Sequence, residues 1–313
     1  MSFNARAGEA PAAPDAGEAP AAPTWVRWAR RVPLALVLAY FFFAFDGILF
    51  LNQGAAERDA FFHARYAQML PERGLSREFR WTQCSVWKDH FADKDFWYHV
   101  YLAPFCQDVR EPLVGAKLAT NLLALIVLAL FYVVLLRLRA PLPLLWVLLL
   151  ATGSGMFLLR LLMVRSHVLS IALMLLAVLA LLKDRFWPCV AIAFVYAWSY
   201  SFPVAMLITA LAFATPPHGG WWRMPAATAV GLAAGLVLNP YFPDNVRTLW
   251  VVVNVAIGGF AGGQVELASE FGRTNVLQWL LQNPGAAVAL LASVVCAWRL
   301  RRRGKLSQES AAV

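Results

Sequence analysis

Acidic, basic and histidine side chains that could move protons or bind phosphate gather in one polar stretch of an otherwise apolar chain. Residues 57–65 read Glu-Arg-Asp-Ala-Phe-Phe-His-Ala-Arg. A carboxylate can accept a proton from an attacking hydroxyl or ligate a divalent cation, and imidazole and guanidinium groups bind phosphate. We therefore expect Asp59 to be catalytic. His63 and Arg65 are candidates for substrate binding, and Glu57 is a candidate metal ligand.

A second polar stretch follows in the same loop. Asp93-Lys94-Asp95 forms a DxD triplet, and His99 lies one helical turn after Asp95. Carboxylate oxygens suit hard ions such as Mg²⁺ or Mn²⁺, so Asp93 and Asp95 are candidate metal ligands and His99 a candidate substrate ligand. A charged helix start explains the triplet equally well, because Asp is favoured in a first turn.

The two stretches share a short pattern. Residues 59–67 and 95–103 both read Asp-x-aromatic-aromatic-His-x-x-x-Ala. Both favour short helices in which Asp and His, four residues apart, face the same way. The aromatic side of each helix is expected to lie in the lipid interface.

Candidates outside this loop are fewer. Asp46 interrupts the first apolar run, where a carboxylate is costly and so a catalytic candidate, although an early helix end at the following glycine also explains it. Arg160, Arg165 and His167 lie in one turn and suit an anionic phosphate, or else extend to lipid headgroups. Tyr241, in an Asn-Pro-Tyr-Phe-Pro stretch, is a candidate for lining the substrate cavity or belongs to a helix stop.

The elements that hold these residues are apolar helices. Of the 313 residues, 60% are hydrophobic and 14% are charged, which is too apolar for a water-soluble domain. The formal net charge of +9 arises from basic clusters at the ends of apolar runs, so it indicates membrane topology rather than nucleic-acid binding. The expected fold class is therefore all-α, a polytopic membrane protein.

The apolar runs predict about eight transmembrane helices. They are residues 33–51, 113–136, 142–159, 168–182, 186–199, 203–215, 224–238 and 286–298. Several are shorter than the ~20 residues that a straight span needs, so half-helices or re-entrant pieces are expected among them. If every basic cluster is cytoplasmic, both termini are cytoplasmic too.

This topology divides the chain into parts. They are a disordered cytoplasmic tail (1–24), a transmembrane domain (25–305) with extracytoplasmic segments (52–112 and 239–284), and a second cytoplasmic tail (306–313). Cys84 and Cys106 share the first extracytoplasmic segment. The sequence leaves open whether they form a disulfide, as an oxidising compartment would allow.

Residues 57–65 resemble the acidic motif that follows the first helix in the GT-C superfamily of membrane glycosyltransferases. Glu57, Asp59, the two phenylalanines, His63 and Arg65 stand in the order of the motif in oligosaccharyltransferase catalytic subunits. Residues 64–70 are similar to a segment of lipid A aminoarabinose transferases and protein mannosyltransferases. The resemblance covers about ten residues and the hydropathy plan of the N-terminal transmembrane module. The second acidic site and the WWDYG signature of oligosaccharyltransferases are missing.

The resemblance implies a transferase that moves a sugar from a polyprenyl-phosphate donor to a lipid or glycan acceptor at the extracytoplasmic face, in a bacterial inner membrane. The resemblance also implies that a divalent cation assists the transfer. It leaves open whether other membrane or soluble subunits take part. No P-loop, zinc-protease or dinucleotide-binding motif occurs, so no nucleotide or redox cofactor is expected. The alternatives are a non-catalytic scaffold and a transporter or flippase for a lipid-linked substrate.

Overall fold

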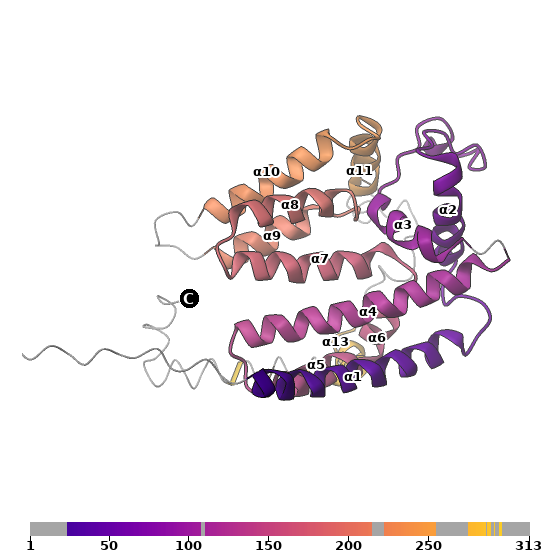
Figure 1. Cartoon of the computed structure of the whole chain (residues 1–313). Helices are drawn as coiled ribbons and strands as arrows, with labels where there is room; N and C mark the ends of the chain where they lie inside the picture. Colours follow the sequence, from indigo (N-terminus) through magenta and orange to yellow (C-terminus); the bar gives the residue numbers. More distant parts are fainter. Residues whose placement is uncertain are drawn as a thin grey trace, which may run out of the picture.

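Helices are the only regular secondary structure in the residues that the computed structural model describes. These are residues 24–107, 110–214, 222–254 and 275–285, with 287, 288, 291, 294 and 295. The all-α class is thus confirmed. The predicted tails lie outside the described residues, apart from Thr24. Figure 1 shows the longer helices stacked side by side, with α2 and α3 gathered beyond one end of the stack.

The predicted apolar runs become helices of unequal length. The long ones are α1 (Thr24–Phe50) and α4 (Pro112–Arg137), and the part of α1 from Pro33 onward and the whole of α4 are long and apolar enough to cross a membrane. The third run is broken into α5 (Pro143–Thr152) and α6 (Gly155–Leu161), which are bent by 87°. Counted as one span, this pair makes three in the described residues.

The remaining runs form shorter apolar helices. They are α7 (Ser166–Leu181), α8 (Phe186–Ala197), α9 (Val204–Phe213) and α10 (Arg223–Val237). At 16 residues, α7 extends about 24 Å, which is less than the hydrocarbon core of a bilayer. The described helices therefore give two or three candidate spans, and the larger number of about eight stays a prediction. Most of the last predicted run, 286–298, lies outside the described residues.

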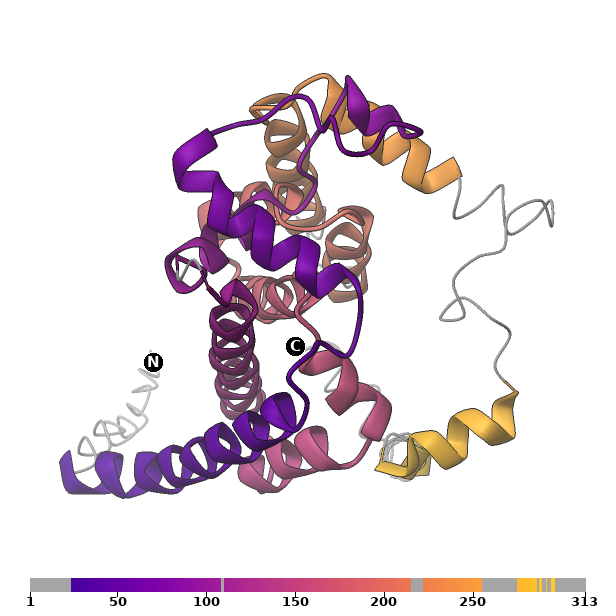
Figure 2. The same cartoon turned by 90° about the vertical axis from the view of Figure 1, so that its right-hand side faces the viewer.

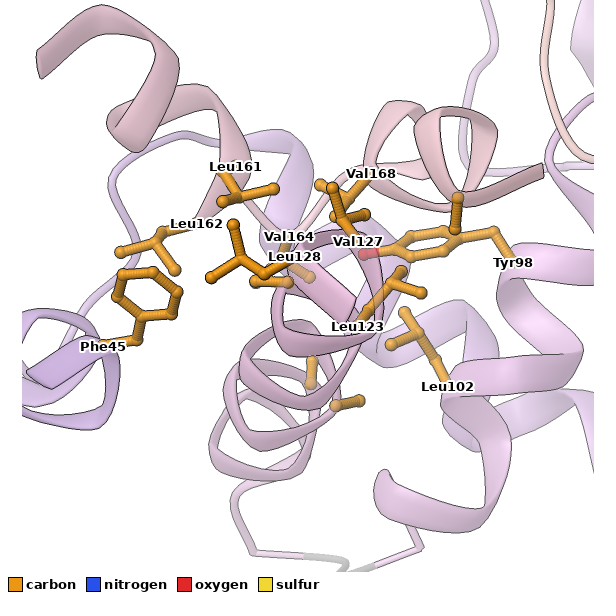
Figure 3. Packing of buried hydrophobic residues seen from close by; sticks show 14 of the residues in the cluster. Phe45, Tyr98, Leu102, Leu123, Val127, Leu128, Leu161, Leu162, Val164 and Val168 are labelled. Carbon is orange, nitrogen blue, oxygen red and sulfur yellow. The ribbon is translucent and has the colours of Figure 1, made fainter. Parts of the chain in front are cut away.

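Helix α4 lies at the centre of the main core. Its residues Leu123, Val127 and Leu128 are buried against side chains of α1, α3, α6 and α7 (Figure 3). Between α8 and α10 the backbones approach closely, since a Cβ at Gly231 would lie 2.3 Å from the carbonyl oxygen of Val190. Small residues at such crossings are typical of helix packing in membranes.

The segment between α1 and α4 carries most of the predicted site. It contains α2 (Asp59–Arg73), α3 (Phe96–Leu102) and two short 3-10 helices (Val86–Lys88 and Ala103–Phe105). Arg77 Nη2 donates to the carbonyl oxygen of Pro240 at 2.8 Å, and His90 lies 3.3 Å from Asp244 at the start of α11 (Asp244–Asn254). The start of the second predicted extracytoplasmic segment therefore lies beside the first, and Figure 2 shows α11 next to the loop that follows α2.

The two cysteines of the segment between α1 and α4 are not bonded to each other. Cys84 is exposed, Cys106 is buried in the core, and both are free thiols. No disulfide joins them in the described structure.

Candidate active site

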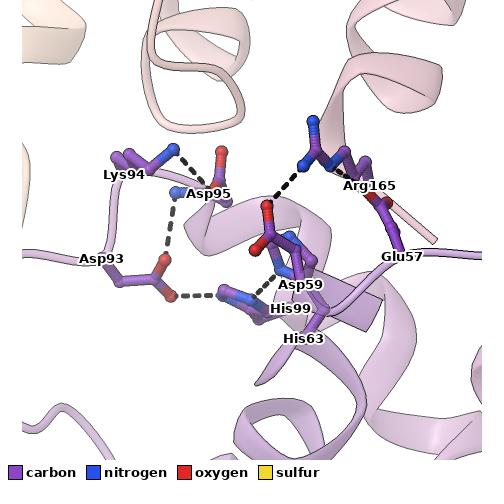
Figure 4. A network of polar contacts seen from close by, with 8 residues as sticks. All are labelled: Glu57, Asp59, His63, Asp93, Lys94, Asp95, His99 and Arg165. Carbon is purple, nitrogen blue, oxygen red and sulfur yellow. Dashed lines mark hydrogen bonds and ion pairs between the residues drawn. The ribbon is translucent and has the colours of Figure 1, made fainter. Parts of the chain in front are cut away.

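Arg165 joins two acids of the first polar stretch. Its Nη2 lies 2.6 Å from Oδ2 of Asp59, and its Nε pairs with Glu57. Arg165 directly precedes α7 and Asp59 begins α2, so the contact bridges 106 residues of sequence. The side chain of Asp59 is 57% exposed and that of Glu57 only 10%. Asp59 is thus the more accessible of the two carboxylates, and Figure 4 shows both beside Arg165.

The two Asp-x-aromatic-aromatic-His segments meet through their histidines. Nδ1 of His63 lies 2.8 Å from Nε2 of His99, and Nδ1 of His99 lies 2.8 Å from Oδ2 of Asp93. A carboxylate accepts hydrogen bonds, so His99 donates to Asp93, and the lone pair left on its Nε2 accepts the proton of His63 Nδ1. This chain ties α2 to α3 and fixes the helix that carries Asp59 (Figure 4).

Burial controls the charge of His63. Its side chain is 6% exposed. Burial first, and then the neighbouring His99, lower the pKa of His63 to about 3. The imidazole is therefore neutral near pH 7 and can hold its place in the chain of hydrogen bonds without a counter-ion.

Asp95 keeps its charge in a buried position. Burial raises its pKa, but Lys94, His63 and His99 together outweigh this, and the net shift is downward. Lys94 Nζ lies 3.5 Å from Oδ2 of Asp95, whereas Oδ1 has no hydrogen-bond partner among the described residues. Ionised carboxylates in such surroundings are costly, which is typical of functional sites.

Aromatic rings form the far wall of the network. The ring of Tyr66 lies 4.7 Å from that of His99, and its hydroxyl lies 3.3 Å from that of Tyr241. Burial raises the pKa of Tyr66 well above its usual value, so the phenol stays neutral. The expectation that the aromatic side faces lipid is wrong for Phe62, which packs on Tyr66 and His99, while Phe61 is exposed.

A cavity of about 270 Å³ lies beside the ion pairs. Glu57 and Lys117 are its charged lining residues, and its other walls include Leu49 of α1 and Leu158 of α6. Lys117 Nζ donates to the carbonyl oxygen of Asn52 at 2.8 Å. An apolar space with a charged end suits a molecule that joins a lipid chain to an anionic group.

Comparisons with known proteins do not identify a relative of this chain. No family model, curated protein or solved structure matches the chain. Membership of the GT-C superfamily therefore stays a prediction, which rests on residues 57–65 and on the hydropathy plan.

Several predicted residues lie outside the network. Asp46 is half-buried in α1, and no hydrogen bond or ion pair between described residues joins it to Asp59. Arg65 donates to the side chain of Gln68, on the outer part of α2. Tyr241 is buried on the far side of Tyr66, where its hydroxyl contacts that of Tyr66 and its ring packs against Phe91 and Phe96.

The other two candidates of the α6–α7 turn differ from Arg165. Nε2 of His167 bonds the carbonyl oxygen of Arg160 at 2.7 Å. His167 thereby satisfies a backbone group at the end of α6. Within this turn, the described contacts link Arg165 directly to the acids of the first stretch.

The predicted metal ligands do not share one place. Both oxygens of Asp93 already accept hydrogen bonds, from His99 and from the backbone of Asp95, whereas Glu57 pairs with Arg165. In the described part of the chain, no three His, Cys, Asp or Glu side chains are grouped as metal ligands. A divalent cation stays a prediction, and no step below depends on it.

Three residues of the site escaped the sequence-based prediction. Lys94 was noted only as the spacer of the DxD triplet, although it faces Asp95. The hydroxyl of Ser166 helps to lower the pKa of Asp95, and Tyr200 lies within range of the same charge. Ser166 follows Arg165 directly, which was a usable signal, but nothing local marks Tyr200.

Proposed function

We propose that this protein is a GT-C-like inverting glycosyltransferase that takes a sugar from a polyprenyl-phosphate donor at the extracytoplasmic face of a bacterial inner membrane. The proposal includes the arrangement of about eight spans with both termini cytoplasmic. The acceptor is a lipid or a glycan. Asp59 is the proposed base.

The observation that carries the proposal is the pairing of Asp59 with Arg165, whose second partner, Glu57, lines the apolar cavity. An exposed carboxylate and a guanidinium 2.6 Å apart supply a proton acceptor and a phosphate ligand in one place. The cavity of about 270 Å³ next to them has space for the first part of a lipid chain. A transporter is favoured less, because transport sites usually lie at mid-bilayer between broken helices.

In the proposed reaction an acceptor oxygen forms a bond to C1 of the sugar while the bond from C1 to the phosphate oxygen breaks. The acceptor's proton passes to Asp59. The bonding electrons leave with the polyprenyl phosphate, whose developing charge Arg165 stabilises. The donor phosphate would compete with Asp59 for Nη2 of Arg165 and so free the carboxylate, while Nε of Arg165 stays paired with Glu57.

The test is transfer of radiolabelled sugar from a panel of polyprenyl-phosphate donors in membranes that contain the protein. Asp59→Asn is expected to reduce the rate by a factor of about 10² to 10⁴, the usual contribution of a general base. Asp184→Asn is the matched control, because Asp184 is also exposed and also lies 2.6 Å from an arginine, Arg223.

Two outcomes would contradict the proposal. Transfer that is unchanged in Asp59→Asn would remove Asp59 from catalysis. Failure to consume any donor, in an assay where a known transferase works, would favour the non-catalytic scaffold.

A further inference from the structure

A groove on the outer part of α2 has a composition that differs from the ion-pair network. Residues of α2 form one wall, and the loop that follows the helix forms the other. The groove consists of a cavity of about 400 Å³ that continues into one of about 310 Å³. Both are lined by Tyr66, Met69, Arg73, Phe79 and Trp81. These volumes are in the range of small-molecule sites.

The loop wall is fixed by backbone bonds and ring packing. The amide of Phe79 donates to the carbonyl oxygens of Trp87 and Lys88 at 3.0 and 3.1 Å. The Phe79 ring stacks on Phe91 with centroids 5.0 Å apart, and Trp81 packs edge-on against Phe79 at 4.9 Å. Trp81 is nevertheless 62% exposed, so one large aromatic surface remains open to a ligand.

The groove carries positive charge without a matching acid. Arg65 bonds the neutral Gln68, and the guanidinium of Arg73 lies 5.3 Å from the ring centre of Trp81. Neither arginine forms an ion pair with a carboxylate in the described part of the chain. Arg80 is different, because Glu78 neutralises it at 2.9 Å. Two guanidinium groups beside an open indole favour an anion attached to a ring with an apolar face.

The groove also points toward the proposed reacting group. Positions 59, 62, 66, 69 and 73 fall within an arc of about 80° around a helix with 100° per residue. Asp59 therefore lies on the same face of α2 as the groove. Arg73 follows it by 14 residues, or about 21 Å of helix rise, which is enough length for several sugar units.

We propose that this groove binds an anionic saccharide, with Trp81 stacking on a sugar ring and Arg65 and Arg73 binding its carboxylate or phosphate groups. On the proposed function, this saccharide is the acceptor, and its reacting end extends along α2 to Asp59. The assignment of the acceptor depends on that function, but binding in the groove does not.

Calorimetric titration of the protein in phosphatidylcholine nanodiscs with trigalacturonate tests the proposal. Arg73→Gln and Trp81→Leu are each expected to raise Kd by a factor of about ten or more, the loss of one charge-assisted contact or one stacked ring. Lys88→Gln removes an exposed charge from the same loop outside the groove, and its Kd should change less than about twofold. Uncharged maltotriose should bind at least about tenfold more weakly.

Three results would overturn the groove assignment: equal binding of maltotriose and trigalacturonate, a Trp81→Leu variant with unchanged Kd, or loss of trigalacturonate binding when the nanodiscs contain phosphatidylglycerol. The last result would identify a lipid headgroup as the occupant. Groove binding without sugar transfer would refute only the proposed function, and transfer without groove binding would refute only the groove.

Discussion

In the first Asp-x-aromatic-aromatic-His segment, the side chain of Asp59 is 57% exposed and paired with an arginine from another helix. In the second, the side chain of Asp95 is only 3% exposed and lies beside the neighbouring Lys94. The histidines of both segments meet, but His99 is bonded on both ring nitrogens, whereas His63 is bonded to His99 alone in the described contacts. The same sequence pattern therefore places one aspartate at the surface and the other in a buried position, and this difference in surroundings determines which of them can react.

We infer that the two segments have different roles. The second segment is a buried structural support for the first, since the hydrogen bonds of His99 connect α3 to α2. The first segment presents its acid at the surface, on the helix that the support holds. Substitutions in the second segment should therefore act on stability, and substitutions in the first should act on activity.

The largest stability effect is expected for His99→Phe. The change leaves both Asp93 and His63 without their bonds to His99 in a buried place, which should cost about 3 kcal/mol, whereas His63→Phe should cost about 1 to 2 kcal/mol. Thermal unfolding in detergent measures both. A larger loss in His63→Phe would reverse the assignment of the second segment as the support.

A smaller decrease in the free energy of unfolding, about 2 kcal/mol, is expected for Asp95→Ala. This change removes a buried, paired charge and leaves Lys94 without that partner. Asp59→Ala should lower the free energy of unfolding by less than about 1 kcal/mol, because the side chain of Asp59 is exposed. Denaturant unfolding of the two variants gives the difference. Equal losses would mean that exposure does not distinguish the two acids.

The pH dependence of stability should show the burial of His63. Its pKa is about 3 in the folded protein, below the ordinary value of 6.5, so the unfolded chain binds the extra proton between these values. Stability is therefore full above pH 6.5 and falls as the pH drops toward 3, by about 1 kcal/mol per unit. In His63→Phe, unfolding measured from pH 7 to 5 should show a shallower slope. An unchanged slope would mean that groups other than His63 cause the pH dependence of stability.

The amino-acid sequence by itself determined the local features of this protein. Hydropathy predicted the helices α4, α7, α8 and α10 almost to their ends, because an apolar run of this length forms helix wherever backbone groups must bond internally. The same reasoning gave residues 142–159 as one apolar run and allowed broken helices among the runs, but it did not locate the 87° bend between α5 and α6, which depends on packing. Residue types and spacing also selected the acids, the histidines and Arg165.

Only the tertiary structure decided which of these residues meet. Arg165 reaches Asp59 across 106 residues, and His63 reaches His99 across 36, while Asp46 remains apart. A sequence pattern reports what lies within a few turns of one helix, whereas these contacts depend on how α2, α3 and α7 pack at one end of α4. The groove beside Trp81 likewise depends on how the loop after α2 packs against that helix.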